Sequence, residues 1–412
     1  MADCDSHQAQ LKPVDEALSF LLDQVKPISG LETLDLNEAL GRVLAAPVKS
    51  QVDVPPWDNS AMDGFAINSQ DLDKHGDRLR VAQRIPAGSA GTPLEPGTAA
   101  RIFTGAPVPE GADAVVIQEV CRVDGEEVVI TERPASGANI RRAGEDILQG
   151  EEILSPGVKL DAQHLGLAAS VGVAGLSVYH RLKVAVFSSG DELVMPGGEL
   201  KAGQIYNSNQ FTLAGLLQRL GCEVIQLGIV EDTFEATCEA LAHGAEAADL
   251  VLASGGVSVG EEDHVKPAVE KLGSLALWKI ASRPGKPLAF GYIAETPFLG
   301  APGNPVSLFV TFSLFARPFI LRMQGITGEV LPQPIKVIAG FEKAATDKRQ
   351  EYARGRLELN EQGKAVVRLY PNPSSGVLSS VVWANGLAVL PPLTAIKPGD
   401  PVDFIPFSEM MT

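Results

Sequence analysis

Apolar residues recur every three or four positions between Pro13 and Pro27, near the start of the chain. This spacing places them on one face of an amphipathic helix that a proline bounds at each end. A second, shorter helix is expected over residues 37–45. Residues 161–179 show the pattern of a helix followed by a strand, and we expect them to form a connecting segment.

Two stretches show the short alternating runs of β-structure. Between residues 51 and 146 the runs RIFTG, DAVVIQEV and EVVITE are separated by Pro, Gly and Asp-Gly turns, which predicts a small β-barrel or sandwich. After Leu331 the runs PIKVIAGF, YARGRLEL, KAVVRLY, GLAVLPP and PVDFIPF follow one another. They predict a second small β domain at the end of the chain.

From Lys183 onward, nearly continuous apolar runs alternate with amphipathic ones. Strands are expected over KVAVFSS, EVIQLGIV and DLVLASGG, and helices over residues 210–220, 233–245 and 263–272. Short strands around LAF and TPFLG precede a long apolar helix from Pro305 to Met323. Buried strands that alternate with helices predict a parallel sheet covered on both faces. Ligands of such sheets bind beyond the carboxyl ends of the strands.

Composition and charge narrow the class of protein. With 412 residues, 45% apolar and 21% charged, the chain should be globular with roughly two to four domains. Its net charge of -17 argues against a broad nucleic-acid or membrane surface. Cys4, Cys121, Cys222 and Cys238 are far apart, so we expect buried free thiols rather than a disulfide framework or a zinc site. With no signal-peptide pattern and no apolar run of membrane length, a cytoplasmic protein is expected.

Small and polar residues follow the third predicted parallel strand, in Ser254-Gly255-Gly256-Val257-Ser258. Successive glycines can turn backbone N–H groups toward one point, and serine hydroxyls can extend this anion nest. The motif therefore predicts a phosphate site. A plain strand-to-helix turn with serine caps explains the same residues.

Carboxylates are expected to gather at the same edge of the sheet, from Asp191, Glu192, Asp232 and Asp263. Two carboxylates about 4 Å apart repel by on the order of 4 kcal/mol at an effective dielectric of 20, which favours a bound cation. Mg²⁺ prefers carboxylate and phosphate oxygens. Asp232 and Asp263 each precede a helical pattern, so each is also a candidate helix N-cap.

Further candidates lie in loops. The stretch KIASRPGKP supplies Lys279, Arg283 and Lys286, and the loop with Pro302 and Pro305 opens the long helix. That loop either positions a ligand or only starts the helix. The polar loops of the first β-like stretch carry further candidate residues, which either have a function or are only charged residues of surface turns. They are Asp58, Asp63, Thr104, Arg141, Arg142, Glu145 and Asp146. Although His264 follows Asp263, no histidine pairs with a nucleophile at the spacing of a catalytic triad.

Together these stretches resemble the MoeA-type molybdopterin molybdenumtransferases, the family that includes the E domain of gephyrin. The matching stretches, in the family's order, are PPWDNSAMDGFAI, RIFTGAPVPEGADAVVIQE, GANIRRAGEDI, VAVFSSGDEL, GQIYNSN, DLVLASGGVSVGEEDHVK, RPGKPLAFG and GAPGNPVS. YARGRL and PNPSSGVLSS continue the resemblance toward the C-terminus. Arg283 departs from the lysine that members often carry, and Glu262 and His264 lie where the family varies, so His264 receives no role.

The resemblance implies a multidomain α/β plus β protein. Its parts would be an elongated connector domain (13–50 and 147–180), an inserted β domain (51–146), an α/β domain of the molybdopterin-binding type with a parallel-rich sheet (181–325) and a C-terminal β domain (326–412). It also implies a homodimer whose cleft lies between the α/β domain of one subunit and the β domains of the other. The upstream adenylyltransferase and the apoenzymes that accept the cofactor would be further partners.

The implied reaction inserts molybdate into adenylylated molybdopterin, with Mg²⁺-dependent release of AMP. Two alternatives stay open: a molybdopterin adenylyltransferase, against which the additional β domains argue, and a cofactor carrier or scaffold without turnover. The expected catalytic residues are Asp63, Thr104, Asp146, Glu192, Asp232 and Asp263. Of these, the first three would face molybdate from the partner subunit, with Arg141, and the last three would hold Mg²⁺ or shape the adenylate site.

The remaining candidates would bind substrate. Ser254, Gly255, Gly256 and Ser258 would hold the pyrophosphate or pterin side. Lys279, Arg283 and Lys286 would neutralise anionic oxygens. Pro302, Pro305, Arg354 and Ser375 complete the set, although YARGRL could instead be an ordinary strand with a solvated basic face.

Overall fold

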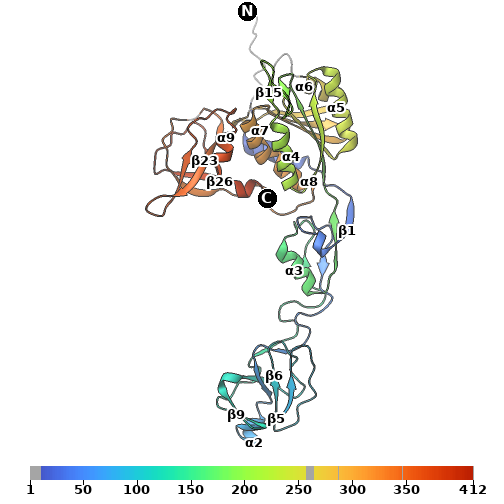
Figure 1. Ribbon diagram of the computed structural model, residues 1–412, viewed down its shortest axis with the longest axis vertical. Helices are drawn as coiled ribbons and strands as arrows, with labels where there is room; N and C mark the ends of the chain where they lie inside the picture. The colour runs from blue at the N-terminus through green and yellow to red at the C-terminus, as the bar shows by residue number, and fades with distance from the viewer. Residues whose placement is uncertain (1–10, 257–263, 286, 346, 412) are drawn as a thin grey trace, which may run out of the picture.

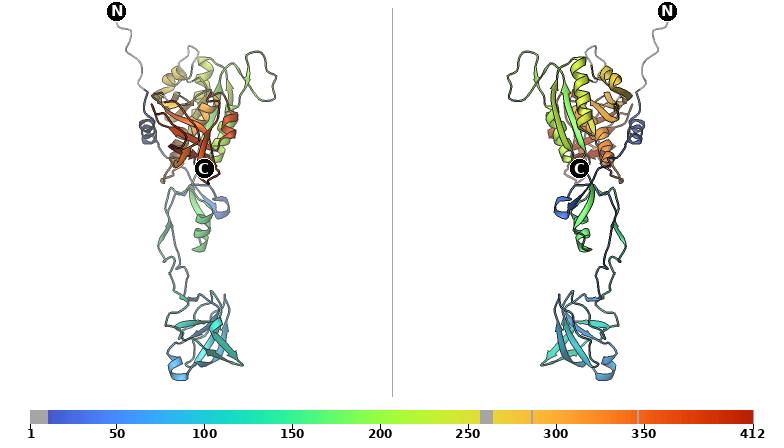
Figure 2. Two further views of the ribbon diagram at one scale, coloured as in Figure 1. Left: turned by 90° about the vertical axis from the view of Figure 1, so that its left-hand side faces the viewer. Right: turned by 90° about the vertical axis from the view of Figure 1, so that its right-hand side faces the viewer.

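The computed structural model describes residues 11–256, 264–285, 287–345 and 347–411. The molecule is elongated: a β domain lies at one end, a slender connector follows, and the α/β domain and the C-terminal β domain lie side by side at the other end (Figures 1 and 2). The chain runs along the connector twice, once toward the β domain and once back. The predicted domain boundaries stay predictions, but the predicted multidomain architecture is confirmed.

The α/β domain is built on one six-stranded mixed sheet. Its order is β16 (Glu223–Val230), β13 (Lys183–Ser189), β17 (Leu250–Ser254), β21 (Thr296–Ala301), β20 (Pro287–Ile293) and β18 (Gly273–Lys279). The first four strands are parallel, and the last two are antiparallel to their neighbours. The parallel-rich sheet is therefore confirmed, and its carboxyl edge collects the turns after β13, β16 and β17.

Helices cover both faces of this sheet. On one face α5 (Phe234–Ala247) and α6 (Val265–Leu272) pack over a core that includes Val251 and Phe298. On the other face lie α1 (Val14–Asp23), α4 (Asn209–Arg219) and the long apolar helix, around a core that includes Phe290 and Phe319. Burial on both sides explains why the strands are apolar at nearly every position.

The long apolar helix is continuous from Pro305 to Met323, as α7 (Pro305–Thr311), a π-helical turn (Phe312–Ala316) and α8 (Arg317–Met323). By length and mean composition alone it could cross a membrane. However, 94% of its most apolar 18-residue stretch is buried inside the protein. It is therefore the core helix of the α/β domain.

The connector is held by short antiparallel pairs, β1 (Leu31–Asp35) with β12 (Gly175–Tyr179) and β2 (Val48–Lys49) with β11 (Glu152–Leu154). Helix α3 (Ala162–Ser170) precedes β12, which confirms the predicted helix-then-strand pattern. The helix expected over residues 37–45 is wrong, because only a 3₁₀ turn, η1 (Leu36–Glu38), forms there. Gly41 then turns the chain with φ 74°, and Leu44 makes a backbone bridge to Val178 instead of continuing a helix.

Both predicted β domains are present. The sheet near the far end has the order β7 (Ala114–Ile117), β4 (Gly64–Ile67), β6 (Thr98–Ile102), β5 (Arg78–Ile85), β9 (Glu127–Ile130) and β8 (Cys121–Asp124), with α2 (Asp71–His75) beside it. The C-terminal sheet joins β23 (Gln350–Leu359), β24 (Ala365–Leu369), β22 (Ile335–Ala339), β26 (Pro401–Pro406) and β25 (Gly386–Leu390). Because β25 also pairs with β23, this sheet closes into a barrel.

Candidate functional site

A cleft of about 1060 Å³ opens beyond the carboxyl ends of the parallel strands, where the α/β domain meets the C-terminal domain. Most of the residues expected to bind substrate from these two domains lie on its wall. The structure brings together Glu192, Asp232, Ser254, Gly255, Gly256, Pro302, Pro305 and Ser375. Cavities of this size at the switch edge of an α/β sheet usually hold a small molecule.

The Ser-Gly-Gly turn after β17 depends on glycine. Gly255 and Gly256 have φ angles of 91° and 64°, and a Cβ on Gly255 would lie 2.5 Å from the carbonyl oxygen of Ser189. The N–H of Gly255 donates to the carbonyl of Ala301 at 3.1 Å. The predicted nest is therefore wrong for this amide, which is not free to hold an anion, whereas the Ser254 hydroxyl lines the cleft. Ser258 lies outside the described residues.

Asn209, the first residue of α4, joins two walls of the cleft. Its amide nitrogen donates to the Ser254 hydroxyl at 2.9 Å and to the carbonyl of Gly303 at 2.7 Å. The turn after β17 is thereby fixed to the proline-rich loop that opens the long helix. Asn209 is a functional candidate that the sequence did not predict, although its place at a strand-to-helix junction was the available signal.

Two carboxylates, Asp232 and Glu192, lie on the wall of the cleft. Thr233, not Asp232, caps α5, since its hydroxyl accepts from the N–H of Ala236 at 3.3 Å. The N-cap alternative for Asp232 is therefore wrong. Asp232 instead accepts a hydrogen bond from the Ser189 hydroxyl at 3.1 Å and lines the cleft with Glu192.

Two carboxylates of the cleft, Glu192 and Asp232, could bind a divalent ion. Within the described residues no three Asp, Glu, His or Cys side chains gather into a metal site, and Asp263 lies outside those residues. Mg²⁺ is commonly held by one or two carboxylates together with substrate phosphates and water. Glu192 and Asp232 fit that requirement when a phosphate-bearing substrate supplies further oxygens.

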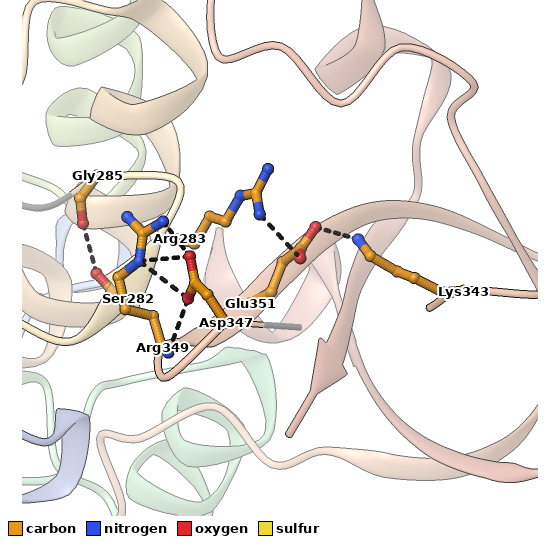
Figure 3. A network of polar contacts seen from close by, with 7 residues as sticks. All are labelled: Ser282, Arg283, Gly285, Lys343, Asp347, Arg349 and Glu351. Carbon is orange, nitrogen blue, oxygen red and sulfur yellow. Dashed lines mark hydrogen bonds and ion pairs between the residues drawn. The ribbon is translucent and has the colours of Figure 1, made fainter. Parts of the chain in front are cut away.

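The basic loop is anchored to the C-terminal barrel (Figure 3). Strand β19 (Ser282–Arg283) pairs with the start of β23, which sets Arg283 beside Glu351. One oxygen of this buried carboxylate lies 3.9 Å from the Arg283 guanidinium, and the other forms an ion pair with Lys343. The Ser282 hydroxyl donates to the carbonyl of Gly285 at 2.6 Å, and Gly285 lines the cleft.

Arg283 therefore points toward the barrel rather than into the cleft. Nearby, Arg349 hydrogen-bonds to Asp347 and lowers the pKa of Asp347 to about 2, with a smaller contribution from Arg283. Lys286 lies outside the described residues, as does the side chain of Lys279. Of the three predicted cations, only Arg283 can thus be placed.

Arg354 does not line this cleft, and its predicted binding of substrate stays a prediction. It is 5% exposed, and its guanidinium donates to the Ser380 hydroxyl at 2.9 Å and to the carbonyls of Asn372 and Ser374 at 3.0 Å. Burial lowers its pKa. Arg354 holds the loop that carries Ser375 to the cleft, so the alternative of a solvated strand face is wrong for this residue.

A second polar group lies on the β domain. The Asp63 carboxylate accepts hydrogen bonds from the Thr104 backbone N–H at 2.8 Å and from its hydroxyl at 2.7 Å, which lowers the pKa of Asp63. Arg141 lies on β10 (Ile140–Arg141), which pairs with β3 (Asn59–Ser60). Asp146 is exposed at the end of the same loop. Three polar loops therefore gather at one end of this domain.

These loops and the cleft do not meet within one chain. The connector separates them along the long axis of the molecule in every view (Figures 1 and 2). The chain thus carries two separate sets of candidate residues, one on the cleft and one on the distant β domain.

The fold is that of a multidomain protein with a polar cleft at the carboxyl edge of an α/β sheet. Residues 12–172 match the MoeA N-terminal region (domain I and II), 185–322 match a probable molybdopterin binding domain, and 336–407 match the MoeA C-terminal region (domain IV). The chain belongs to the MoeA family of molybdopterin molybdenumtransferases.

Individual relatives agree over nearly the whole length. The chain is 40% identical to a molybdopterin molybdenumtransferase of Haemophilus influenzae, over 97% of this chain and 99% of the relative. A relative of the same name from Nostoc is 39% identical over 87% of this chain and 85% of its own length. A crystal structure of the molybdopterin biosynthesis MoeA protein from Pyrococcus horikoshii covers 96% of this chain and 100% of its own, with a TM-score of 0.83 and 29% identity.

Proposed function

We propose that this chain inserts molybdate into adenylylated molybdopterin and releases AMP, which completes the molybdenum cofactor. As a member of its family it is a transferase of molybdenum cofactor biosynthesis. The observation that carries the specific reaction is the cleft of about 1060 Å³, which presents carboxylates, hydroxyls and a glycine turn to one ligand. We also propose a cytoplasmic location, with the adenylyltransferase that makes the substrate as a partner.

The cleft's own residues would position the substrate. Ser254 and Ser375 would donate to its phosphate oxygens, and Asn209 would keep the Ser254 hydroxyl in place. Glu192 and Asp232 would hold Mg²⁺, which when bound would neutralise the charge that develops on the departing AMP. The dithiolene of the substrate binds the molybdenum, so the protein needs no thiolate ligand. Buried Cys222, whose pKa burial raises to about 12, is consistent with this.

The distant β domain has a role if two chains share each cleft. In a homodimer, the β domain of one subunit would bring its Asp63, Thr104, Arg141 and Asp146 to the cleft of the other. Asp63, kept ionised by its two hydrogen bonds from Thr104, would accept hydrogen bonds from the hydration water of the reacting molybdate. The separation of the two sets within one chain supports this arrangement.

The test is molybdate-dependent release of AMP from purified molybdopterin-AMP. Repeated turnover that requires both molybdate and a divalent ion is the expected result. Transfer of AMP from ATP to molybdopterin without molybdate would instead indicate an adenylyltransferase. A single burst of one AMP per subunit, without further release, would indicate a carrier.

A further inference from the structure

We propose that Arg84 and Arg101, stacked with Phe103, form an oxyanion site on the β domain. Arg84 on β5 and Arg101 on β6 are paired positions of two parallel strands, so both side chains leave the same face of the sheet. The guanidinium carbons lie 4.6 and 4.7 Å from the centre of the Phe103 ring. The strands β5 and β6 are labelled in the lower domain of Figure 1.

The two charges are placed together without an ion pair to any carboxylate of the described residues, although Arg101 is near enough to Asp63 to help lower the pKa of that carboxyl. Like charges at opposed positions of neighbouring strands repel, and proteins commonly relieve this with a carboxylate. Further along β5, Arg78 pairs with Asp124 and Glu127, and Arg80 approaches Glu95 at 3.7 Å. Among the described residues, by contrast, no carboxylate lies within ion-pair distance of the Arg84 or Arg101 guanidinium. On a chain with net charge -17, two adjacent arginines that form no ion pair with the described residues point to an anionic ligand.

The site has a defined shape because Arg101 is held in place. Its guanidinium donates to the carbonyl of Gly64 at 3.2 Å and to the side chain of Gln118 at 2.8 Å, and it also lies 5.1 Å from the centre of the Phe65 ring. Arg84 is exposed, and its guanidinium lies over the Phe103 ring without a hydrogen bond or ion pair to any residue that the structure describes. Its N–H groups therefore remain available to a ligand, while stacking limits the directions in which the guanidinium can point.

The position of the site and the chemistry of its arginines indicate which class of ligand it binds. Phe103 directly precedes Thr104, whose hydrogen bonds hold Asp63, so the arginine pair adjoins the loops proposed to face the reaction. Planar guanidinium groups bind tetrahedral oxyanions through paired hydrogen bonds. The ligand is therefore a small oxyanion, supplied either as molybdate or as the phosphate of the adenylate. This identification rests on the proposed function, whereas the site itself does not.

The experiment measures binding of molybdate and, separately, of AMP to the full-length protein by calorimetry. Arg84→Gln should weaken the affinity for one of the two about tenfold, the loss expected of one charge-assisted hydrogen bond. Loss for molybdate alone assigns the site to molybdate, and loss for AMP alone assigns it to the adenylate phosphate. Arg101→Gln should weaken the same affinity, but it also removes hydrogen bonds within the domain. The result for Arg84→Gln is therefore the one that tests the site.

Arg122→Gln is the matched control, because Arg122 is an exposed arginine on β8 of the same domain. Its affinities should equal those of the wild type. The site is overturned if Arg84→Gln binds both ligands as the wild type does, or if Arg122→Gln loses as much affinity. Wild-type protein that releases no AMP, yet binds an oxyanion in an Arg84-dependent way, would refute the proposed reaction and leave the site standing.

Discussion

Asp232 and Thr233 are adjacent residues whose duties can be separated by substitution. Thr233→Ala removes the cap of α5 and should lower stability by about 1 kcal/mol while turnover stays near the wild-type value. Asp232→Asn keeps the shape and a hydrogen-bonding oxygen but loses the charge, so melting should be near native. Its molybdate-dependent AMP release should fall by a factor of roughly 10² to 10³. Normal turnover of Asp232→Asn with saturating Mg²⁺ would contradict its place in the reaction.

The glycine turn at the cleft allows a test with an internal control. Gly255→Ala places a Cβ 2.5 Å from a backbone oxygen in addition to requiring a φ of 91°. Gly363→Ala requires a φ of 72° but has no atom within 4 Å of the new Cβ. The second change should cost about 1–2 kcal/mol from the φ angle alone, and Gly255→Ala should cost clearly more. Equal unfolding free energies from denaturant titration would mean that the turn relaxes.

Single residues of the cleft could be predicted from the sequence only where a polar side chain directly follows a predicted parallel strand. Glu192 and Asp232 follow strand ends, and their shared edge could be predicted from the alternation of strands and helices. Arg354 could not be placed, because a strand pattern does not reveal that a guanidinium turns inward to three partners. Asn209 was missed for a similar reason, since its two hydrogen bonds join segments far apart in sequence.

Among elements, the junction of β19 with β23 carries one buried carboxylate, Glu351, that faces two cations. Glu351 is 4% exposed, and Glu351→Gln would leave Lys343 and Arg283 facing a neutral amide. We expect a loss of roughly 2–3 kcal/mol, below the usual cost of breaking a buried pair because Lys343 is partly exposed, and a raised KM for molybdopterin-AMP. Lys336→Gln, which breaks the exposed pair with Asp403, should cost less than about 1 kcal/mol. Equal losses for both variants would show that the Glu351 pairs contribute no more than a surface pair.

The Asp347–Arg349 pair beside this junction predicts a dependence on pH. The folded pKa of Asp347 is about 2, below the ordinary value of 3.8, so the pair stabilises the fold above the ordinary pKa and its contribution is lost as pH falls through about 2. The difference in unfolding free energy between the wild type and Asp347→Asn should therefore be constant above about pH 5 and shrink below about pH 4. A difference that grew on acidification would contradict this sign.

Whole elements were predicted best where burial alone decides the pattern. The parallel strands and the helix from Pro305 to Met323 are apolar because both sides are covered, and their pattern reveals this directly. The helix expected over residues 37–45 failed because Gly41 and the bridge from Leu44 to Val178 override a local helical pattern. The strand predicted around LAF is present as β20, whereas β18 and the antiparallel direction of both strands follow from pairing across the sheet, which a local pattern does not encode.

At the scale of the whole molecule, the elongated shape predicts that activity needs two chains. If each active site joins the cleft of one subunit to the β domain of the other, Asp63→Asn and Asp232→Asn damage different halves of that site. In a mixed dimer, one site then contains both intact residues and the other contains neither. Random mixing gives one half mixed dimers, so activity should recover to about a quarter of the wild-type level.

The control for this experiment mixes Asp63→Asn with Thr104→Val. Both changes lie in the β domain, so every site of a mixed dimer receives one damaged β domain, and no recovery is expected. Subunit exchange must be verified by tagging the two chains differently and isolating dimers that carry both tags. Verified dimers of Asp63→Asn with Asp232→Asn that stay inactive would refute the shared site, because a site contained in one chain is damaged in both partners. Recovery in this pair alone requires that the two residues act across the dimer, since no other arrangement leaves one complete site.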